Sequence, residues 1–260
     1  MPNRNELENE RNQLSEIAKD IEKAIVKEEF TLYYQPQFDL KTGKITGMEA
    51  LVRWIHPVRG MISPAIFIPF AEESKQIYAL EKWIFRNALQ QKAQWEKDGR
   101  RHLELAINIS SKTLGSEAAF HEIEEIMLRY KVDYTSVVIE ITETALLVDM
   151  ELAAKRVHRL KKFGVKIALD DFGTGYSSLM HLKTLPIDII KIDRSFVALV
   201  PEEEKDTIII KNIVSFARDL KYRVVAEGIE KQEQLEFLRE ISCESGQGFL
   251  LCKPIRCQAP

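Results

Sequence analysis

Short apolar runs that favour β-strands alternate with amphipathic helical patterns, and this alternation constrains the fold more than any other feature. The strand-like runs are Phe30–Gln35, Ile45–Trp54, Glu104–Ile109, Ser136–Ile141, Val165–Asp170, Ile187–Ile192, Arg223–Glu227 and a weaker one near Gly246–Leu251. Between them apolar residues recur at helical spacing, as at Leu80, Ile84 and Ala88. Strands that alternate with helices in this way predict an α/β fold, a closed TIM-type barrel rather than an open sheet.

The connection between the first two strands departs from this pattern. The segment from Gln35 to Glu49 is short and contains the turn-like residues Lys41 to Lys44. A parallel crossover needs a helix, whereas an antiparallel hairpin needs only a turn. We therefore predict a modified (β/α)8 barrel with an antiparallel first strand.

The N-terminal segment differs in character from the rest of the chain. The pattern of residues 4–26 predicts one polar helix, because Leu7, Leu14 and Ile21 recur every seven residues. Such a helix either packs on its own domain or links the domain to an upstream one. The 260 residues suffice for one barrel. We therefore predict a linker-like helix over 1–26 and a barrel domain over 27–257.

Charge and cysteine content exclude several classes of protein. Lys and Arg number 37 against 40 Asp and Glu, a net charge of −3 that disfavours binding to DNA or RNA. No apolar run approaches the ~18 residues of a membrane helix, so we expect no membrane contact from this segment. Residues 1–25 are too polar for a secretory signal. The three cysteines lack metal-ligand spacing, which indicates reduced thiols and a cytoplasmic location.

Polar side chains stand where the predicted strands end, the place where β/α barrels carry their chemistry. They are Glu49, Asn108, Glu140, Asp170 with Asp171, Lys191, Glu227 and Gln247. Several carboxylates converging on one barrel mouth would repel each other unless cations neutralised them. Oxygen ligands select Mg²⁺ or Mn²⁺, while zinc prefers His or Cys. The adjacent pair Asp170-Asp171 suits two cations, the arrangement used to hydrolyse phosphate esters.

The two basic residues near this ring have more than one interpretation. Lys191 either neutralises the acids, positions or deprotonates an attacking water, or meets a phosphate oxygen. Arg53 either clamps a phosphate or forms a structural ion pair. A barrel glycosidase is another possible class of function. It needs only two carboxylates, and its cleft is usually lined by aromatic residues. With 8% aromatic residues the chain disfavours a glycosidase.

The tripeptide Glu49-Ala50-Leu51, followed by Val52-Arg53-Trp54, resembles the signature of the EAL-domain family, the cyclic di-GMP phosphodiesterases. The resemblance extends over about residues 28–255. Further matching segments are Tyr34-Gln35-Pro36-Gln37, Asn108-Ile109-Ser110, Glu140-Ile141-Thr142-Glu143, Asp170-Asp171-Phe172-Gly173-Thr174-Gly175, Lys191-Ile192-Asp193, Ala226-Glu227-Gly228 and Gln247-Gly248. The ordered set is far more specific than the tripeptide alone.

The resemblance implies hydrolysis of cyclic di-GMP to linear pGpG, with two Mg²⁺ or Mn²⁺ ions per active site, which lowers this second messenger in bacterial signalling. The implied metal ligands are Glu49, Asn108, Glu140, Asp170 and Asp171. The implied catalytic residues are Lys191, Glu49 and Glu227, and the implied substrate contacts are Gln35, Leu51, Arg53 and Gln247. Glu143 is implied to anchor the loop Phe172–Leu179.

The resemblance also implies a homodimer, and the linker-like helix is compatible with an upstream sensor or GGDEF-type domain. A non-catalytic cyclic di-GMP receptor is the alternative function. Receptors of that kind typically lose metal ligands or the loop sequence, and this chain retains both. It departs from the family pattern at Lys231 and near Cys252, away from every implied metal ligand.

Overall fold

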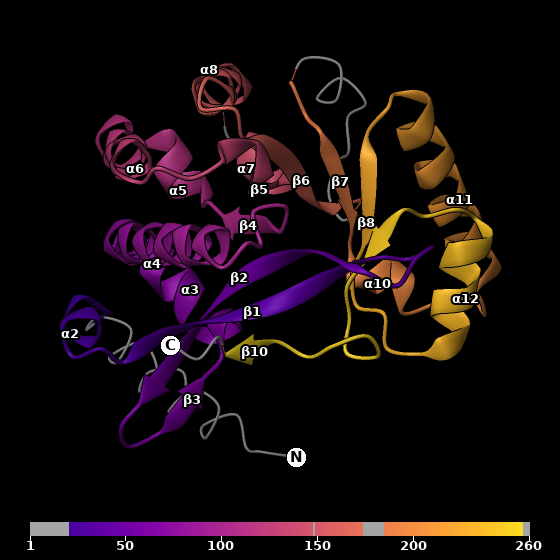
Figure 1. Ribbon diagram of the computed structural model, residues 1–260, viewed down its shortest axis with the longest axis horizontal. Helices are drawn as coiled ribbons and strands as arrows, with labels where there is room; N and C mark the ends of the chain where they lie inside the picture. The colour runs from indigo at the N-terminus through magenta and orange to yellow at the C-terminus, as the bar shows by residue number, and fades with distance from the viewer. Residues whose placement is uncertain (1–20, 148, 174–184, 257–260) are drawn as a thin grey trace.

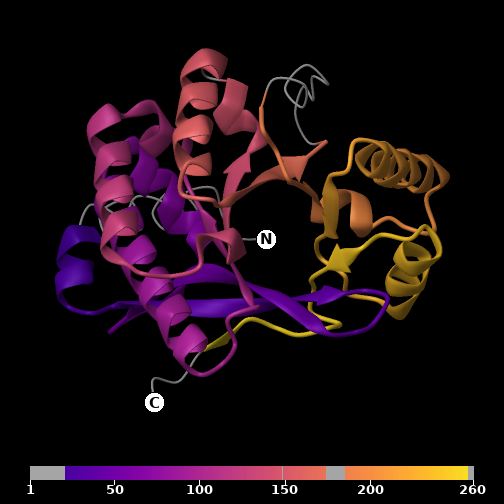
Figure 2. The ribbon, with the colours of Figure 1, turned by 45° about the horizontal axis from the view of Figure 1, so that its top comes forward.

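The computed structural model describes residues 21–147, 149–173 and 185–256, and they form a closed barrel surrounded by helices (Figures 1 and 2). The barrel strands are β1 (Phe30–Asp39), β2 (Ile45–His56), β4 (Glu104–Asn108), β5 (Val137–Thr142), β6 (Lys166–Phe172), β7 (Ile189–Ile192), β8 (Arg223–Ala226) and β9 (Ser245–Gly246). Each strand pairs with the next, and β9 pairs back with β1 to close the ring. The predicted barrel is therefore confirmed.

The first strand is reversed, as predicted. β1 runs antiparallel to both β2 and β9, and Gln35 lies opposite Glu49 in the ladder between β1 and β2. From β2 to β9 the neighbouring strands are parallel. The hairpin turn is held by Asp39, whose carboxylate accepts the Thr42 backbone N–H at 2.6 Å. Gly43 follows with φ 69°, a conformation that costs glycine little.

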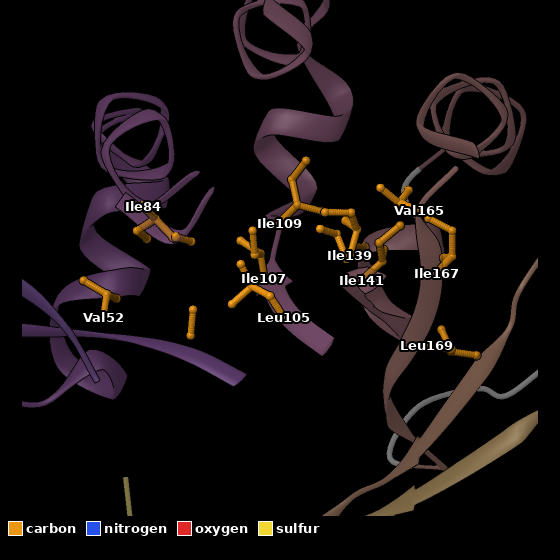
Figure 3. Close-up of a cluster of buried hydrophobic side chains, with 14 of the residues drawn as sticks. Val52, Ile84, Leu105, Ile107, Ile109, Ile139, Ile141, Val165, Ile167 and Leu169 are labelled. Carbon is orange, nitrogen blue, oxygen red and sulfur yellow. The ribbon is translucent and has the colours of Figure 1, made fainter. Parts of the chain in front are cut away.

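Helices cover the outside of the barrel. They are α3 (Pro64–Glu73), α4 (Ile77–Lys97), α5 (Ser111–Gly115), α6 (Glu117–Arg129), α7 (Glu143–Leu147), α8 (Met150–Lys161), α10 (Arg194–Val197), α11 (Glu204–Asp219) and α12 (Gln232–Glu240), with a 3₁₀ turn at Tyr134–Ser136. The predicted apolar stripe of α4, Leu80, Ile84 and Ala88, is buried. Figure 3 shows Ile84 near Val52 of β2 in the layer between strands and helices.

The strands alternate strictly between two environments because successive side chains point to opposite faces. Large aliphatic residues such as Leu105 and Ile107 of β4 belong to the main core shared with the helices (Figure 3). The residues between them form a second, separate apolar cluster inside the barrel, made of Ala106, Val138, Ala168, Ile189 and Val225. Each member comes two positions before a polar residue predicted for the site. The polar residues therefore lie one layer further toward the C-terminal mouth.

The last barrel strand is shorter and earlier than predicted. It spans Ser245–Gly246 instead of Gly246–Leu251, and residues 249–251 form a turn. Beyond β9 the Gln247 backbone N–H still donates to the Ala226 carbonyl, and the Gln247 carbonyl accepts the Ile229 N–H from the turn after β8. Gly248 then packs on the Ile229 backbone, where any Cβ would lie 2.1 Å from the Ile229 carbonyl oxygen. Two short strands outside the barrel were not predicted, β3 (Gly60–Ile62) and β10 (Ile255–Arg256).

The described part of the predicted N-terminal helix is α2 (Ile21–Val26). Ile21 of the predicted stripe is buried in the main core, together with Ala24. The Glu22 backbone N–H donates to the Gln76 side chain at 3.4 Å. Residues 4–20 of the predicted helix lie outside the described residues. None of the helices in the described parts of the chain has the length and apolar character needed to cross a bilayer.

Candidate functional site

The polar residues at the C-terminal mouth gather around one lysine. The Lys191 Nζ atom lies 2.9 Å from both Glu140 Oε2 and Glu227 Oε1, and 3.2 Å from Asp170 Oδ1. Glu49 Oε2 is slightly further away, at 3.7 Å. The Lys191 side chain is 1% exposed, so these contacts are shielded from solvent. We call Lys191 and these four acids the carboxylate ring.

Two amide side chains orient the ring. Asn108 Nδ2 donates to Glu49 Oε1 at 3.1 Å, and Gln247 Nε2 donates to Glu49 Oε2 at 2.6 Å. Gln247 Nε2 also lies 2.9 Å from Glu227 Oε1. The Asn108 nitrogen is thus committed to Glu49, which leaves the amide oxygen as the atom suited to a cation. The structure therefore brings together residues that the sequence places on seven different strands or strand ends.

Asp171 joins the ring through an irregularity in β6. The pairing of β6 with β7 shifts register between Leu169 and Phe172, and Asp171 has φ 55°. This β-bulge breaks the alternation that would otherwise send Asp171 to the opposite face from Asp170. Oxygen atoms of Asp170, Asp171 and Glu227 lie within 4.8 Å of one another, close enough to share a metal ion. One left-handed non-glycine residue, Asp171, thus stands where three carboxylates meet.

Burial dominates the proton affinities of the ring. Burial, and then the neighbouring carboxylates, raises the pKa of Glu140 well above its usual range. Burial likewise raises the pKa of Glu227 to about 8, although the Lys191 charge opposes this. For Glu49 the same burial is outweighed by Lys191 and the amide hydrogen bonds, which together hold its pKa below the ordinary value. The carboxylates outweigh burial for Lys191, so its pKa is raised well above normal.

The residues present fit hard divalent cations. Among the described residues, Lys191 is the one cationic side chain within 4.0 Å of the four ring carboxylates, so negative charge is in excess. The donors are carboxylate and amide oxygens, which suit Mg²⁺ or Mn²⁺ better than zinc. Burial and the Asp170 charge also raise the pKa of Asp171, a sign that the cluster lacks positive charge. An added cation would supply it.

A cavity of about 410 Å³ opens beside the ring, between β2 and the helices α3, α4 and α5. Leu51, Arg53 and Asn108 line it. Leu51 and Arg53 share a face of β2 with Glu49 because they follow it at two-residue steps. Arg53 Nη1 donates to the Val52 carbonyl at 2.9 Å, and no described carboxylate lies within 4.0 Å of the guanidinium. The guanidinium also lies over the Tyr33 ring and interacts with the Glu49 charge, and it is the positive group that the cavity wall offers to an anionic ligand.

Two further predicted residues support the surroundings of the ring. Gln35 is buried, and its Nε2 lies 3.5 Å from the Cys252 carbonyl. Glu143 at the start of α7 is buried, and its Oε2 accepts the Gly173 backbone N–H at 3.3 Å. That contact lies at the beginning of the predicted loop Phe172–Leu179. Residues 174–179 of this loop lie outside the described residues.

Sequence reasoning gave no site role to the two acids of the cavity wall, Glu72 of α3 and Glu81 of α4. Glu81 of α4 is 4% exposed, accepts the Ser110 backbone N–H at 2.6 Å and lines the cavity. Burial raises the pKa of Glu81 to about 7. The available signal was an acid next to Leu80, within the apolar stripe of the helix. The sequence shows such an acid, but it does not show that the acid contacts Ser110, which is distant in the chain.

The fold and the site define a β/α-barrel protein with an oxygen-lined, acidic mouth suited to divalent cations. The chain belongs to the EAL-domain family, since the model of that family matches residues 18–254. The predicted resemblance is therefore confirmed.

Two curated proteins illustrate the similarity. An uncharacterized signaling protein of Caulobacter vibrioides is 41% identical over 92% of this chain. Cyclic di-GMP phosphodiesterase PA2567 of Pseudomonas aeruginosa is 39% identical over 88% of it. The chain spans only 29% and 39% of the lengths of these two relatives. The solved structure titled PaMucR phosphodiesterase, c-di-GMP complex, superposes with a TM-score of 0.89 and 35% identity, covering 94% of this chain and 98% of that one.

Proposed function

We propose that this chain is a metal-dependent phosphodiesterase domain that hydrolyses cyclic di-GMP to linear pGpG. The observation that carries the proposal is the excess of carboxylates around Lys191, beside a cavity lined by Arg53. A relative named cyclic di-GMP phosphodiesterase and a cyclic di-GMP complex of similar structure support the choice of substrate. This activity would lower the level of the second messenger in bacterial signalling.

Two Mg²⁺ or Mn²⁺ ions are proposed per site. Their proposed ligands are Glu49, Asn108, Glu140, Asp170 and Asp171, with Glu227 close enough to take part. Bound cations would polarise the phosphodiester and activate water for attack. Asn108 and Gln247 fix the Glu49 carboxylate before any cation arrives, since each donates to a different oxygen of it.

Lys191 is proposed to orient the attacking water. In the metal-free protein the surrounding carboxylates raise the pKa of Lys191, which favours an ammonium that donates hydrogen bonds to its neighbours. Of the roles considered from sequence, positioning is therefore favoured over deprotonation. Arg53, Leu51, Gln35 and Gln247 are proposed to contact the substrate, and Glu143 to hold the loop after β6.

The decisive experiment incubates the protein with cyclic di-GMP and Mg²⁺ or Mn²⁺ and follows the nucleotides by chromatography. We expect pGpG to form, and formation to stop when EDTA is added. A chain that binds cyclic di-GMP without converting it, at any metal concentration, would instead be the receptor considered above. Absence of both binding and turnover would exclude both functions.

The setting of the domain is part of the proposal. We propose a cytoplasmic homodimer in which residues 1–26 form a linker-like helix and residues 27–257 the catalytic barrel. The greater length of the relatives supports an upstream sensor or GGDEF-type domain. Light scattering of the purified chain tests the dimer, for which a molar mass near twice 30.0 kDa is expected.

A further inference from the structure

The one-turn helix α10 lies at the barrel mouth, between the turns that follow β6 and β8. It begins directly after β7, the strand that carries Lys191. Asp193 links strand and helix, since its carboxylate accepts the Ser195 backbone N–H at 2.9 Å. This N-cap fixes the helix close to the end of β7.

One side of α10 packs on the turn that follows β6. Gly173 in this turn has φ 98°, and a Cβ added there would lie 2.8 Å from Cε2 of Phe196. The Phe196 ring therefore rests directly on the Gly173 backbone. The same glycine donates its N–H to Glu143, so the turn is held from two sides. Asp171 lies only two residues before it.

The other side of α10 packs on the turn that follows β8. Gly228 has φ 70°, and a Cβ there would lie 2.5 Å from the Arg194 Cβ. Gly228 comes directly after Glu227, whose backbone N–H donates to the Ile192 carbonyl at 3.1 Å. The position of Glu227 is thus tied both to the end of β7 and to the start of α10.

These contacts matter because β6 and β8 are not neighbours in the sheet. β7 lies between them, so no ladder of hydrogen bonds joins the strand of Asp170 and Asp171 to the strand of Glu227. Oxygen atoms of these three carboxylates nevertheless lie within 4.8 Å of one another. β7 pairs with both strands, and α10 touches the turns that follow both of them, so this helix can serve as an additional support for the spacing.

We propose that α10 is this support, and that Phe196 is a positioning residue for the metal site. Its ring, resting on Gly173, holds the bulge of Asp171 at the distance from Glu227 that a shared cation requires. Cations are sensitive to ligand spacing, and loss of an outer support typically weakens metal binding 10- to 100-fold. The consequence for catalysis rests on the proposed function, whereas the effect on metal affinity does not.

The test compares Phe196→Ala with Phe196→Tyr and Ser195→Ala. The tyrosine keeps the ring over Gly173, and Ser195 lies on the same helix but contributes to its cap through the backbone alone. Mn²⁺ binding is measured by electron paramagnetic resonance of the free ion, and folding by thermal unfolding in EDTA. We expect Phe196→Ala to raise the Kd for Mn²⁺ about tenfold and both controls to bind as the parent does.

Each outcome has a distinct meaning. If Phe196→Ala binds Mn²⁺ with the parent affinity, the positioning role is wrong. If it unfolds, Phe196→Leu, which keeps apolar volume without the ring, replaces it and is held to the same expectation. If the unsubstituted protein binds Mn²⁺ but forms no pGpG, the proposed function is wrong. The positioning role of Phe196 is then still decided by comparing the Mn²⁺ Kd of Phe196→Ala with that of the unsubstituted protein. A parent that binds no Mn²⁺ overturns both.

Discussion

The two ends of the barrel interior carry charged clusters of opposite design. At the N-terminal end, Glu104 Oε1 lies 2.5 Å from Lys166 Nζ and Glu104 Oε2 lies 2.6 Å from Arg223 Nη2. One acid there faces two bases. At the C-terminal end, Lys191 faces four acids. The apolar layer of Ala106, Val138, Ala168, Ile189 and Val225 separates the clusters by sequence position in the strands.

The proton affinities follow this difference. Burial raises the pKa of Glu104, but Arg223 and Lys166 outweigh it and hold the pKa below the ordinary value. For Glu227, burial and the neighbouring acids win, and the pKa rises to about 8. The acid of the N-terminal cluster is therefore neutralised by the chain itself, as expected of a structural ion pair, although the described residues offer Arg223 Nε no hydrogen-bond partner. The C-terminal ring lacks positive charge that only a ligand can supply, as expected of a binding site.

The largest expected effect comes from Glu49→Gln. This change removes one negative charge and one metal-binding oxygen while it keeps the side-chain shape. We expect turnover of cyclic di-GMP to fall by about 10³-fold or more, because loss of transition-state stabilisation by a metal ligand costs several kcal/mol. Initial rates at saturating Mn²⁺ measure the loss. Near-parental turnover by this variant would remove Glu49 from the metal site.

The matched change at the opposite end is Glu104→Gln, which should act on stability alone. It leaves Lys166 and Arg223 without their shared acid. Because both cations are partly exposed, we expect a loss of about 2 kcal/mol rather than the larger cost of breaking a fully buried pair. The Tm should fall by about 5 °C, with kcat unchanged within twofold. A large drop in kcat without loss of stability would contradict the contrast between the two ends.

The sequence predicted one end of the barrel far better than the other. Asn108, Glu140 and Lys191 each follow an apolar run, so the predicted strand ends were enough to place them at one mouth of the barrel. Glu104 and Arg223 begin their strands, and no local rule joins residues 119 positions apart in the chain. The bulge at Asp171 was also invisible, because a left-handed aspartate has no signature in the residues around it. Local patterns thus predict strand ends, while pairings across the barrel need the closed ring.

The smallest expected effect sharpens the comparison through pH. Glu227 binds its proton more tightly in the folded protein than an ordinary carboxyl does, so this group stabilises the metal-free fold at low pH. That contribution is lost as pH rises from the ordinary glutamate pKa through about 8. A divalent cation must displace the same proton, which costs about 1.4 kcal/mol per pH unit below that pKa. The rise in Tm caused by a fixed Mg²⁺ concentration should therefore be about 3 °C greater at pH 8 than at pH 7.

Thermal unfolding with Mg²⁺ and with EDTA at each pH measures this difference, and Glu227→Gln provides the control. The glutamine cannot release a proton, so the pH dependence of the Mg²⁺ effect should shrink in that variant. Glu104→Gln should leave it unchanged, because the Glu104 pKa lies below the ordinary value and this carboxyl stays ionised across the whole range. An Mg²⁺ effect of equal size at both pH values would mean that cations do not compete with the Glu227 proton. The cluster around Glu104 and the carboxylate ring would then differ in net charge, but the ring would not depend on a divalent cation any more than the Glu104 cluster does.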